Sequence, residues 1–344
     1  FELLPWGQGD ETAARMFCDI SNLDGTPFEG DPRQVLRRNL DAARERGFSF
    51  YAAPEMEFFY FADADPSTPP TPLDQASYFD LTTADIATDL RQRTIHTLEA
   101  MGIPVEYSHH EDAPSQHEID LRYTDALTMA DTIMTSRLTV KEVALKHGIY
   151  ATFMPKPIFD ENNPRSSESD NGSGMHVSVS LWSGGSNMFY DPDDFYAELS
   201  QIGRYFIGGL LKHASSLAAL VAPTVNSYHR LVPGFEAPVY GAWSRGNRSA
   251  VLRVPVNDKK TGKSKRIEFR APDPSANPYL AFSATVAAGL DGIREKTDPG
   301  DPVNEDIYKM SDSTRRAFGI KTLPRTLQDS IEALKNDKDF LKPY

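Results

Sequence analysis

The sequence predicts an α+β fold built on a mainly antiparallel sheet. Segments with the two-residue alternation of strands interleave with segments of helical periodicity, but not in the strict strand–helix–strand order that builds a parallel sheet. The 344 residues can form one large domain or two modest ones, and a hydrophobic content of 40% allows a sizeable core. The formal net charge of −13 argues against nucleic acid or a membrane surface as the main partner.

Capping and turn residues delimit the expected elements in the first half of the chain. Asp31 followed by Pro32 starts a helix that continues to about Gly47. A second helix over 125–147 ends at Gly148, a residue that suits the left-handed position after a helix. The other elements expected here are strands over 14–20, 48–61, 105–109 and 118–123 and a helix over 83–101.

The second half of the chain shows the same kinds of signal. Alternation over 176–182 predicts a strand that aims His176, Ser178 and Ser180 at the same space. Residues 160–170 are polar and contain Asn, Pro and Ser, which predicts a surface loop. The remaining expected elements are a strand over 150–154 and helices over 193–220, 278–296 and 327–336.

Cysteine usage and hydropathy indicate the compartment. Cys18 is the only cysteine, so an internal disulfide is impossible and a reducing cytoplasm is expected. The chain shows no signal peptide and no apolar stretch of about 18 residues or more. We therefore expect a soluble, cytoplasmic protein.

Acidic residues on short strand-like runs are the most informative feature for function. Glu55 and Glu57 share one face of a strand, and the phenylalanines that follow them argue for burial. Carboxylates between apolar residues are costly to bury unless cations compensate them, and oxygen-rich ligand sets suit magnesium or manganese rather than zinc. The pattern predicts a two-metal enzyme acting on phosphate, with the candidate ligands Glu55, Glu57, Glu111, Glu118, His176 and Glu268.

Arginines form a second informative group. Arg266 and Arg270 flank Glu268 at a spacing of two, so the three side chains share a strand face. Phosphoryl transfer requires this mixture, because metals bridge phosphate oxygens and guanidinium groups stabilise charge on the moving group. The group also contains Arg230, Arg245, Arg248 and Arg253.

Two loops allow more than one interpretation. The turn 171–174 contains a Gly-x-Gly pair, which is usually a simple turn, and it lacks the Lys-Ser/Thr of the common nucleotide loop; we interpret it as a turn that contacts substrate. Glu236 lies on a loop shaped by Pro233, Gly234 and Pro238, where an acid could gate a site or act as a base. The local sequence alone favours a simple turn residue at Glu236.

Taken in order, the motifs resemble those of prokaryotic-type, class I glutamine synthetase over nearly the whole chain. The matching segments are 54–59, 109–111, 116–118, 151–157, 171–176, 223–228, 230–238, 247–249 and 266–280. The resemblance implies a curved antiparallel sheet with outer helices. It also implies that residues 1–28 are the remnant of an N-terminal β-grasp domain with its last strand, that 29–344 are the catalytic domain, and that the family's C-terminal end is missing.

The resemblance implies a role for each matching residue. It gives Glu57, Glu111 and Glu118 to a first metal ion and Glu55, His176 and Glu268 to a second. The implied glutamate contacts are Asn171, Gly172, Arg230, Arg248 and Arg270. The implied ATP contacts are Glu106, Tyr123, Ser178, Ser180, Arg253, Lys263 and Arg266. The implied catalytic residues are Glu236, Arg248, Arg270 and Tyr78, with Glu236 on a flap and Tyr78 at the ammonium site.

The resemblance also implies a reaction and an assembly. ATP would phosphorylate the γ-carboxylate of glutamate, and ammonia would attack the resulting γ-glutamyl phosphate to give glutamine, with ADP and phosphate as the other products. Mg2+ or Mn2+, two or more per site, would serve as cofactors. The subunits would form a homo-oligomer of two stacked six-membered rings.

Two alternatives stay open at this point. A relative that joins glutamate to a larger amine would keep most of these motifs, although Tyr78 and Glu236 favour ammonium. A catalytically inactive relative with a structural role would be expected to lose metal ligands, whereas all six candidate ligands are present.

Overall fold

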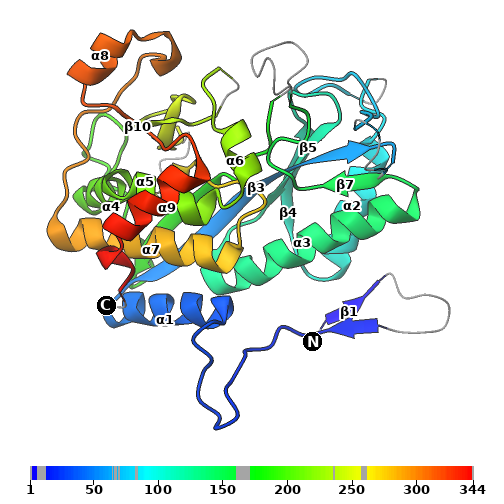
Figure 1. Cartoon of the computed structure of the whole chain (residues 1–344). Helices are drawn as coiled ribbons and strands as arrows, with labels where there is room; N and C mark the ends of the chain where they lie inside the picture. Colours follow the sequence, from blue (N-terminus) through cyan, green and yellow to red (C-terminus); the bar gives the residue numbers. More distant parts are fainter. Residues whose placement is uncertain are drawn as a thin grey trace.

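In the computed structural model, one large sheet organises the chain (Figure 1). The structure describes residues 2–5, 13–63, 65, 68, 70–81, 84–159, 171–234, 237–256 and 262–342. The strands of the large sheet are β3 (Ser49–Phe61), β4 (Val105–His110), β5 (Gln116–Leu121), β6 (Thr124–Asp125), β7 (Tyr150–Thr152), β8 (Val177–Ser183), β9 (Ser186–Asn187), β10 (Tyr240–Ser244), β11 (Ala250–Arg253), β12 (Ile267–Phe269) and β13 (Lys321–Thr322).

The sheet confirms the predicted α+β class with mainly antiparallel pairing. Its path runs β13-β10-β11-β12-β8-β3-β5-β4, while β6 and β7 also pair with β3 and β9 pairs with β8. Among the described pairings, only β10 with β11 is parallel. Strands from both halves of the sequence therefore meet in one surface.

Strand β3 is the centre of the sheet, because it pairs with both β5 and β8. Its side chains alternate between the two faces. Met56 and Phe58 are buried in the main hydrophobic core, whereas Glu55 and Glu57 point to the opposite face. The predicted strand over 48–61 is thus confirmed almost residue for residue, and it separates the core from a polar face.

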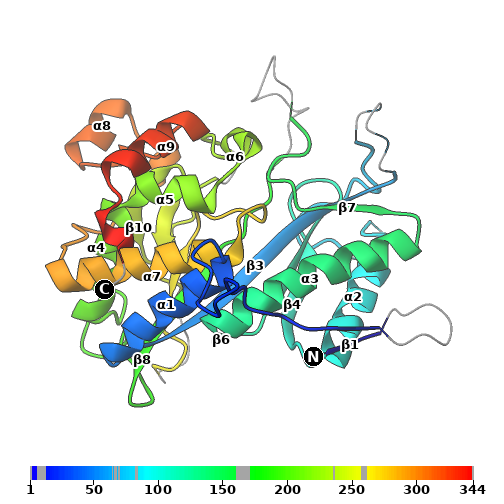
Figure 2. The same ribbon diagram turned by 60° about the horizontal axis from the view of Figure 1, so that its bottom comes forward.

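Helices cover the apolar face of the sheet (Figures 1 and 2). Helix α7 packs closely against α1 and α4 and is buried along most of its length. Gly209 of α4 and Gly292 of α7 allow this approach, since a Cβ atom on either would clash with the backbone of the facing helix. The helices are α1 (Pro32–Glu45), α2 (Thr88–Ala100), α3 (Ala126–Lys146), α4 (Gln201–Lys212), α5 (Ala214–Val221), α6 (Val225–Arg230), α7 (Pro278–Glu295), α8 (Asp312–Ala317) and α9 (Leu327–Asn336), with the 3-10 turns η1 (Ile307–Lys309) and η2 (Asp339–Leu341).

Three predicted elements are wrong in extent. The strand expected over 14–20 is limited to β2 (Ala13–Arg15), which pairs with β1 (Glu2–Leu4). The long helix expected over 193–220 starts only at Ser200, whose side chain caps α4, and it breaks at His213 into α4 and α5. Helix α2 begins at Thr88 rather than 83. The loop expected over 160–170 lies outside the described residues.

The β1–β2 hairpin forms a small sheet apart from the large one. The division into a remnant over 1–28 and a catalytic domain over 29–344 stays a prediction. Among the described residues, no helix combines the length and the apolar character that a membrane crossing requires.

Candidate active site

The polar face of the sheet gathers acids from strands that are distant in sequence. Across the β3–β5 pair, Glu57 lies opposite Glu118 and Glu55 lies opposite Asp120. His176 immediately precedes β8, and its carbonyl accepts from the Glu55 amide at 2.9 Å. Glu268 of β12 lies opposite Ser178 of β8. The register of four strands therefore sets the spacing of these groups.

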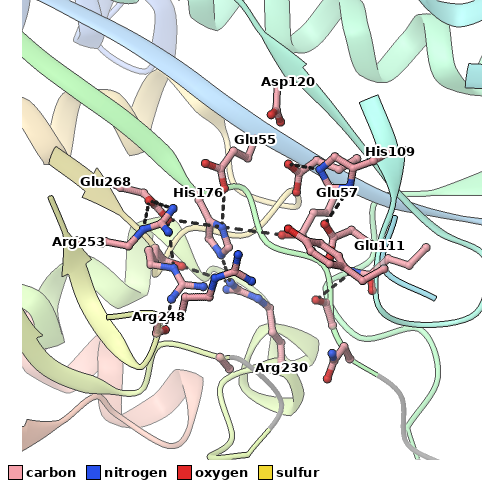
Figure 3. Close-up of a pocket in the computed structure, with 17 residues that line it drawn as sticks. Glu55, Glu57, His109, Glu111, Asp120, His176, Arg230, Arg248, Arg253 and Glu268 are labelled. Atoms are coloured by element: carbon pink, nitrogen blue, oxygen red, sulfur yellow. Dashed lines mark hydrogen bonds and ion pairs between the residues drawn. The ribbon is translucent and has the colours of Figure 1, made fainter. Parts of the chain in front are cut away.

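One group brings together Glu55, His176 and Glu268, which the sequence predicts to share a metal (Figure 3). The Nδ1 atom of His176 lies 2.9 Å from Glu55 Oε2 and 3.9 Å from Glu268 Oε1. The Nε2 atom of the same ring lies 3.3 Å from an Arg230 guanidinium nitrogen, so Nδ1 is the ring nitrogen that faces Glu55 and Glu268. Burial and the charge of Arg270 hold the pKa of His176 well below its ordinary value, so the ring is neutral.

A second group brings Glu111 and Glu118 together around His109. The ring nitrogens Nδ1 and Nε2 of His109 lie 3.3 Å from Glu111 Oε1 and from Glu118 Oε1, respectively. Glu57, the third ligand predicted here, lies between the two groups. Its Oε2 atom accepts from Gln116 Nε2 and from the Gly174 amide, both at 2.9 Å, and its Oε1 atom is 3.9 Å from His176 Nδ1.

The carboxyls of this face are poorly solvated, and the donor set fits hard divalent cations. Burial raises the pKa of Glu57 to about 7, with a contribution from the nearby Glu55. Burial likewise raises the pKa of Asp120 to about 7 and that of Glu118 well above its ordinary value. The Oδ1 atom of Asp120 is buried without a hydrogen-bond partner among the described residues. A cation among these oxygens would satisfy them and remove the repulsion.

Arginines close the group on the side of β11 and β12. Glu268 is almost fully buried and forms ion pairs with Arg253 and with Arg270. Arg230 is also buried, and its guanidinium donates to the carbonyls of Ala271 and Arg270 at 3.1 and 3.2 Å. Fixed cationic forks of this kind bind carboxylate and phosphate oxygens in pairs.

Two connected cavities contain most of the predicted site. The first, of about 220 Å³, is lined by all six predicted metal ligands and by Tyr78, Asn171, Gly172, Arg230, Arg248, Arg253 and Arg270. The second, of about 360 Å³, is lined by Glu106, Tyr123, Ser178, Ser180, Lys263 and Arg266, which are the remaining predicted ATP contacts. Glu55 and Asp120 line both cavities. Glu236 lies outside the described residues, although Ala237 lines the first cavity.

Three polar residues that line the first cavity are not among the site residues predicted from the sequence. Asp120 repeats the spacing of two that joins Glu55 to Glu57, so the same rule applied after Glu118 would have found it. His109 stands in a histidine-rich run without a pattern of its own. Gln116 is a buried amide that donates to Glu57, and nothing in its local sequence marks it.

An acid-rich cavity that also contains arginines, and that shares Glu55 and Asp120 with a larger cavity, indicates a metal-dependent enzyme that transfers a phosphoryl group. Comparison with known proteins identifies the class more closely. The family model described as "Glutamine synthetase, catalytic domain" matches residues 29–344. The chain belongs to the glutamine synthetase family, and it is therefore an ATP-dependent glutamate–ammonia ligase.

Several curated relatives carry the name glutamine synthetase. The protein of Thermotoga maritima is 50% identical over 338 residues, which are 98% of this chain and 74% of the relative. The protein of Halobacterium salinarum is 51% identical over 340 residues, 98% of this chain and 72% of the relative. The protein of Thermus thermophilus is 48% identical over 326 residues, 94% of this chain and 70% of the relative.

Proposed function

We propose that the two cavities hold the two halves of one reaction, the ATP-dependent ligation of ammonia to the γ-carboxylate of glutamate. Glutamate and ammonium occupy the smaller, acid-lined cavity, and ATP occupies the larger one. The observation that carries this proposal is the junction: Glu55 and Asp120 line both cavities, and Arg253 and Glu268 lie beside them. The γ-phosphate of ATP and the γ-carboxylate of glutamate meet there.

The glutamate-binding part uses fixed donors. Arg230 and Arg270 are buried guanidinium groups that suit carboxylate binding, and Asn171 and Gly172 line the same cavity. A side chain at Gly172 would clash with the Pro155 carbonyl and the stem of Arg230, so only glycine lets the backbone approach substrate here. Arg248 is exposed at the mouth, where it stabilises charge on the transferred phosphoryl group.

The nucleotide part has an apolar wall and a charged end. Tyr123 packs edge-on against Tyr51, which gives adenine an aromatic surface. The polar contacts come from Glu106, Ser178, Ser180, Lys263, Arg253 and Arg266. Orientation of the nucleotide by these groups brings its terminal phosphate to the junction.

The metal ions are Mg2+ or Mn2+, at least two per site. One is held by Glu55, His176 and Glu268 and the other by Glu57, Glu111 and Glu118. Bound there, the ions neutralise phosphate and carboxylate charge and orient the phosphates. Neutral imidazole and carboxylate oxygens are the donors that such ions accept.

The reaction then proceeds in two balanced steps. A γ-carboxylate oxygen of glutamate attacks the γ-phosphorus, and the bond from phosphorus to the β-phosphate oxygen breaks, so that ADP leaves. Ammonium gives a proton to a carboxylate of the acid-rich wall near Tyr78, and the nitrogen attacks the carbonyl carbon. The bond to the phosphate oxygen breaks, and phosphate leaves with the second proton. The catalytic role that the resemblance implies for Glu236 stays a prediction, because Glu236 lies outside the described residues.

The same proposal places the chain in the cytoplasm as a homo-oligomer of stacked six-membered rings, with residues 1–28 as a segment of a β-grasp domain. Exposed apolar side chains on that segment support a contact between subunits: Met16, Ile20, Leu23 and Phe28. A native mass near that of twelve chains is the expected result, and a monomer would contradict this part.

The test of the activity is a product assay. With glutamate, ATP and either Mg2+ or Mn2+, the protein should form glutamine and release phosphate when ammonium is added. Putrescine or ethanolamine in place of ammonium should give little γ-glutamyl product. Phosphate release that depends on the larger amines, and not on ammonium, would overturn the choice of amine while leaving the ligase chemistry intact.

A further inference from the structure

A buried polar cluster lies directly behind the acid-lined cavity and has no role in the reaction described above. Asp74, Asp85, His110 and His117 are all buried, and one ligand-type atom from each lies within 4.8 Å of the others. The spacing of these atoms would allow them to bind a metal ion. Arg91 satisfies part of the cluster from within the chain, whereas Asp74 Oδ2 and His117 Nε2 are buried without a hydrogen-bond partner among the described residues.

Arg91 supplies the positive charge of this cluster. Its Nη2 atom lies 2.6 Å from Asp85 Oδ2, and its Nη1 atom lies 2.8 Å from His117 Nδ1. A guanidinium in that position pairs the Asp85 carboxylate and gives His117 a donor. Arg91 therefore links Asp85 to His117, while Asp74 and His110 form a second pair with different partners.

Asp74 and His110 connect two segments that both reach the cavity. His110 Nε2 lies 3.1 Å from Asp74 Oδ1, and His110 Nδ1 lies 2.6 Å from the carbonyl oxygen of Glu111. Both oxygens only accept hydrogen bonds, so both ring nitrogens carry hydrogen. The His110 side chain is 0% exposed and the Asp74 side chain is 2% exposed, so water does not compete for these hydrogen bonds.

The same pair fixes the loop that carries Tyr78. Asp74 Oδ1 also accepts from the Ser115 amide at 2.8 Å, and Ser115 Oγ accepts from the amides of Leu73 and Asp74. A few residues on, the Phe79 amide donates to the His110 carbonyl at 3.1 Å. The loop over 72–81 is thus joined through backbone groups to the strand ends on either side of Glu111.

We propose that Asp74 and His110 are positioning residues that set the distance between Tyr78 and Glu111 at the amine-accepting end of the cavity. Tyr78 and Glu111 both line this cavity but come from different segments. Their relative position is determined by the Asp74–His110 pair, which holds the backbone beneath each of them. This inference rests on the proposed roles of Tyr78 and Glu111.

The protein offers a matched control for a buried aspartate–histidine pair. His213 Nε2, at the end of α4, lies 2.9 Å from Asp291 Oδ2 of α7, and the two side chains are 3% and 4% exposed. Neither residue lines either cavity. Losing either aspartate removes a buried hydrogen bond of the same chemistry. Only Asp74, however, touches the segments that carry Tyr78 and Glu111.

The test compares Asp74→Ala, Asp74→Asn and Asp291→Ala in the full chain by steady-state kinetics. Asp74→Ala should raise KM for ammonium about tenfold and leave KM for ATP within about twofold, because outer-shell groups typically change affinity or activity 10–100-fold. Asp74→Asn keeps an acceptor oxygen and should restore part of the loss. Asp291→Ala should leave both KM values unchanged.

Ser115→Gly is the second variant in case Asp74→Ala does not fold. It removes the Oγ atom that holds the 72–81 loop, and glycine suits the backbone φ of 59° at this position. The expected rise in KM for ammonium is in the same direction. An unchanged KM for ammonium in Asp74→Ala, or in Ser115→Gly where Asp74→Ala does not fold, would overturn the proposal.

Tyr78→Phe separates this inference from the function on which it rests. A raised KM for ammonium in Tyr78→Phe with an unchanged value in the Asp74 variants means that Tyr78 acts at the amine and that the pair does not position it. An unchanged KM in Tyr78→Phe means that the proposed role of Tyr78 is itself wrong.

Discussion

At the scale of single residues, Glu268 connects the arginines of the cavity with the proposed metal site. Its carboxylate is 1% exposed, pairs with Arg253 and Arg270, and lies 3.9 Å from the ring of His176. The carboxylate therefore faces both the arginines and the proposed metal site. Removing it should therefore affect metal binding and phosphate binding together.

Glu268→Gln tests this shared role. The amide keeps the shape but loses the negative charge, so the concentration of Mg2+ or Mn2+ that gives half-maximal activity should rise at least about tenfold. The measurement is a metal titration of glutamine formation. Glu99→Gln, at an exposed position of α2 outside both cavities, is the matched control and should behave as the unaltered protein. Identical titrations for the two variants would exclude Glu268 as a ligand.

At the scale of elements, the helices behind the sheet are joined by a buried aspartate on α7. Asp291 lies 2.9 Å from Lys212 Nζ and from His213 Nε2, and His213 Nδ1 lies 2.7 Å from Asp337 after α9. Arg294 also contacts Asp291. Phe340 stacks on the His213 ring with centroids 4.1 Å apart. The C-terminal elements are thereby held against α4 and α7.

Asp291 gives this contact a defined pH dependence. Burial opposes the charge of Asp291, but hydrogen bonds from His213 and Lys212 outweigh it, so the pKa of the carboxyl lies below its ordinary value. A lowered pKa stabilises the folded state above the unfolded value of about 4, and this contribution is lost as the pH falls through the folded value. Asp291→Asn should therefore reduce the free energy of unfolding by about 2 kcal/mol at pH 7.

Urea unfolding at two pH values measures this effect. The difference between Asp291→Asn and the unaltered protein should be present in full at pH 7 and should be smaller at pH 3, because the carboxyl loses its charge as the pH falls through its folded-state pKa. Glu295→Gln, an exposed change on the same helix, should show no difference at either pH. A difference that persists unchanged at pH 3 would show that shape, and not charge, is lost.

Elements also differ in how well the sequence predicts them. Strand β3 was predictable because alternation and apolar neighbours act in the same direction over 13 residues. The helix over 193–220 was misjudged because its apolar pattern continues through His213, where a tertiary contact with Asp291 and Asp337 interrupts it. The same limit applies to the site: spacing of two finds Glu55 and Glu57, whereas the pairing of Glu55 with Asp120 depends on strand register.

At the scale of the whole molecule, folding concentrates negative charge that the unfolded chain keeps apart. Strands β3, β5 and β12 and the end of β4 each contribute at least one acid to the smaller cavity. The site therefore depends on long-range order, which explains why family motifs were needed to divide the six candidate ligands between two ions. We therefore expect cation binding to stabilise the fold.

Removal of divalent metal should consequently destabilise the whole chain. A cation that binds only the folded state adds about 2.7 kcal/mol at a free concentration one hundred times its dissociation constant. After treatment with EDTA, addition of Mg2+ or Mn2+ should raise the thermal unfolding midpoint measured by circular dichroism. The reference is the EDTA-treated protein without added metal. Because the added stability comes from the acids of the cavity, Glu55→Gln should reduce the rise, whereas Asp291→Asn should lower the midpoint and keep the full rise. An equal rise in Glu55→Gln and in the unaltered protein would place the stabilising cation elsewhere in the molecule.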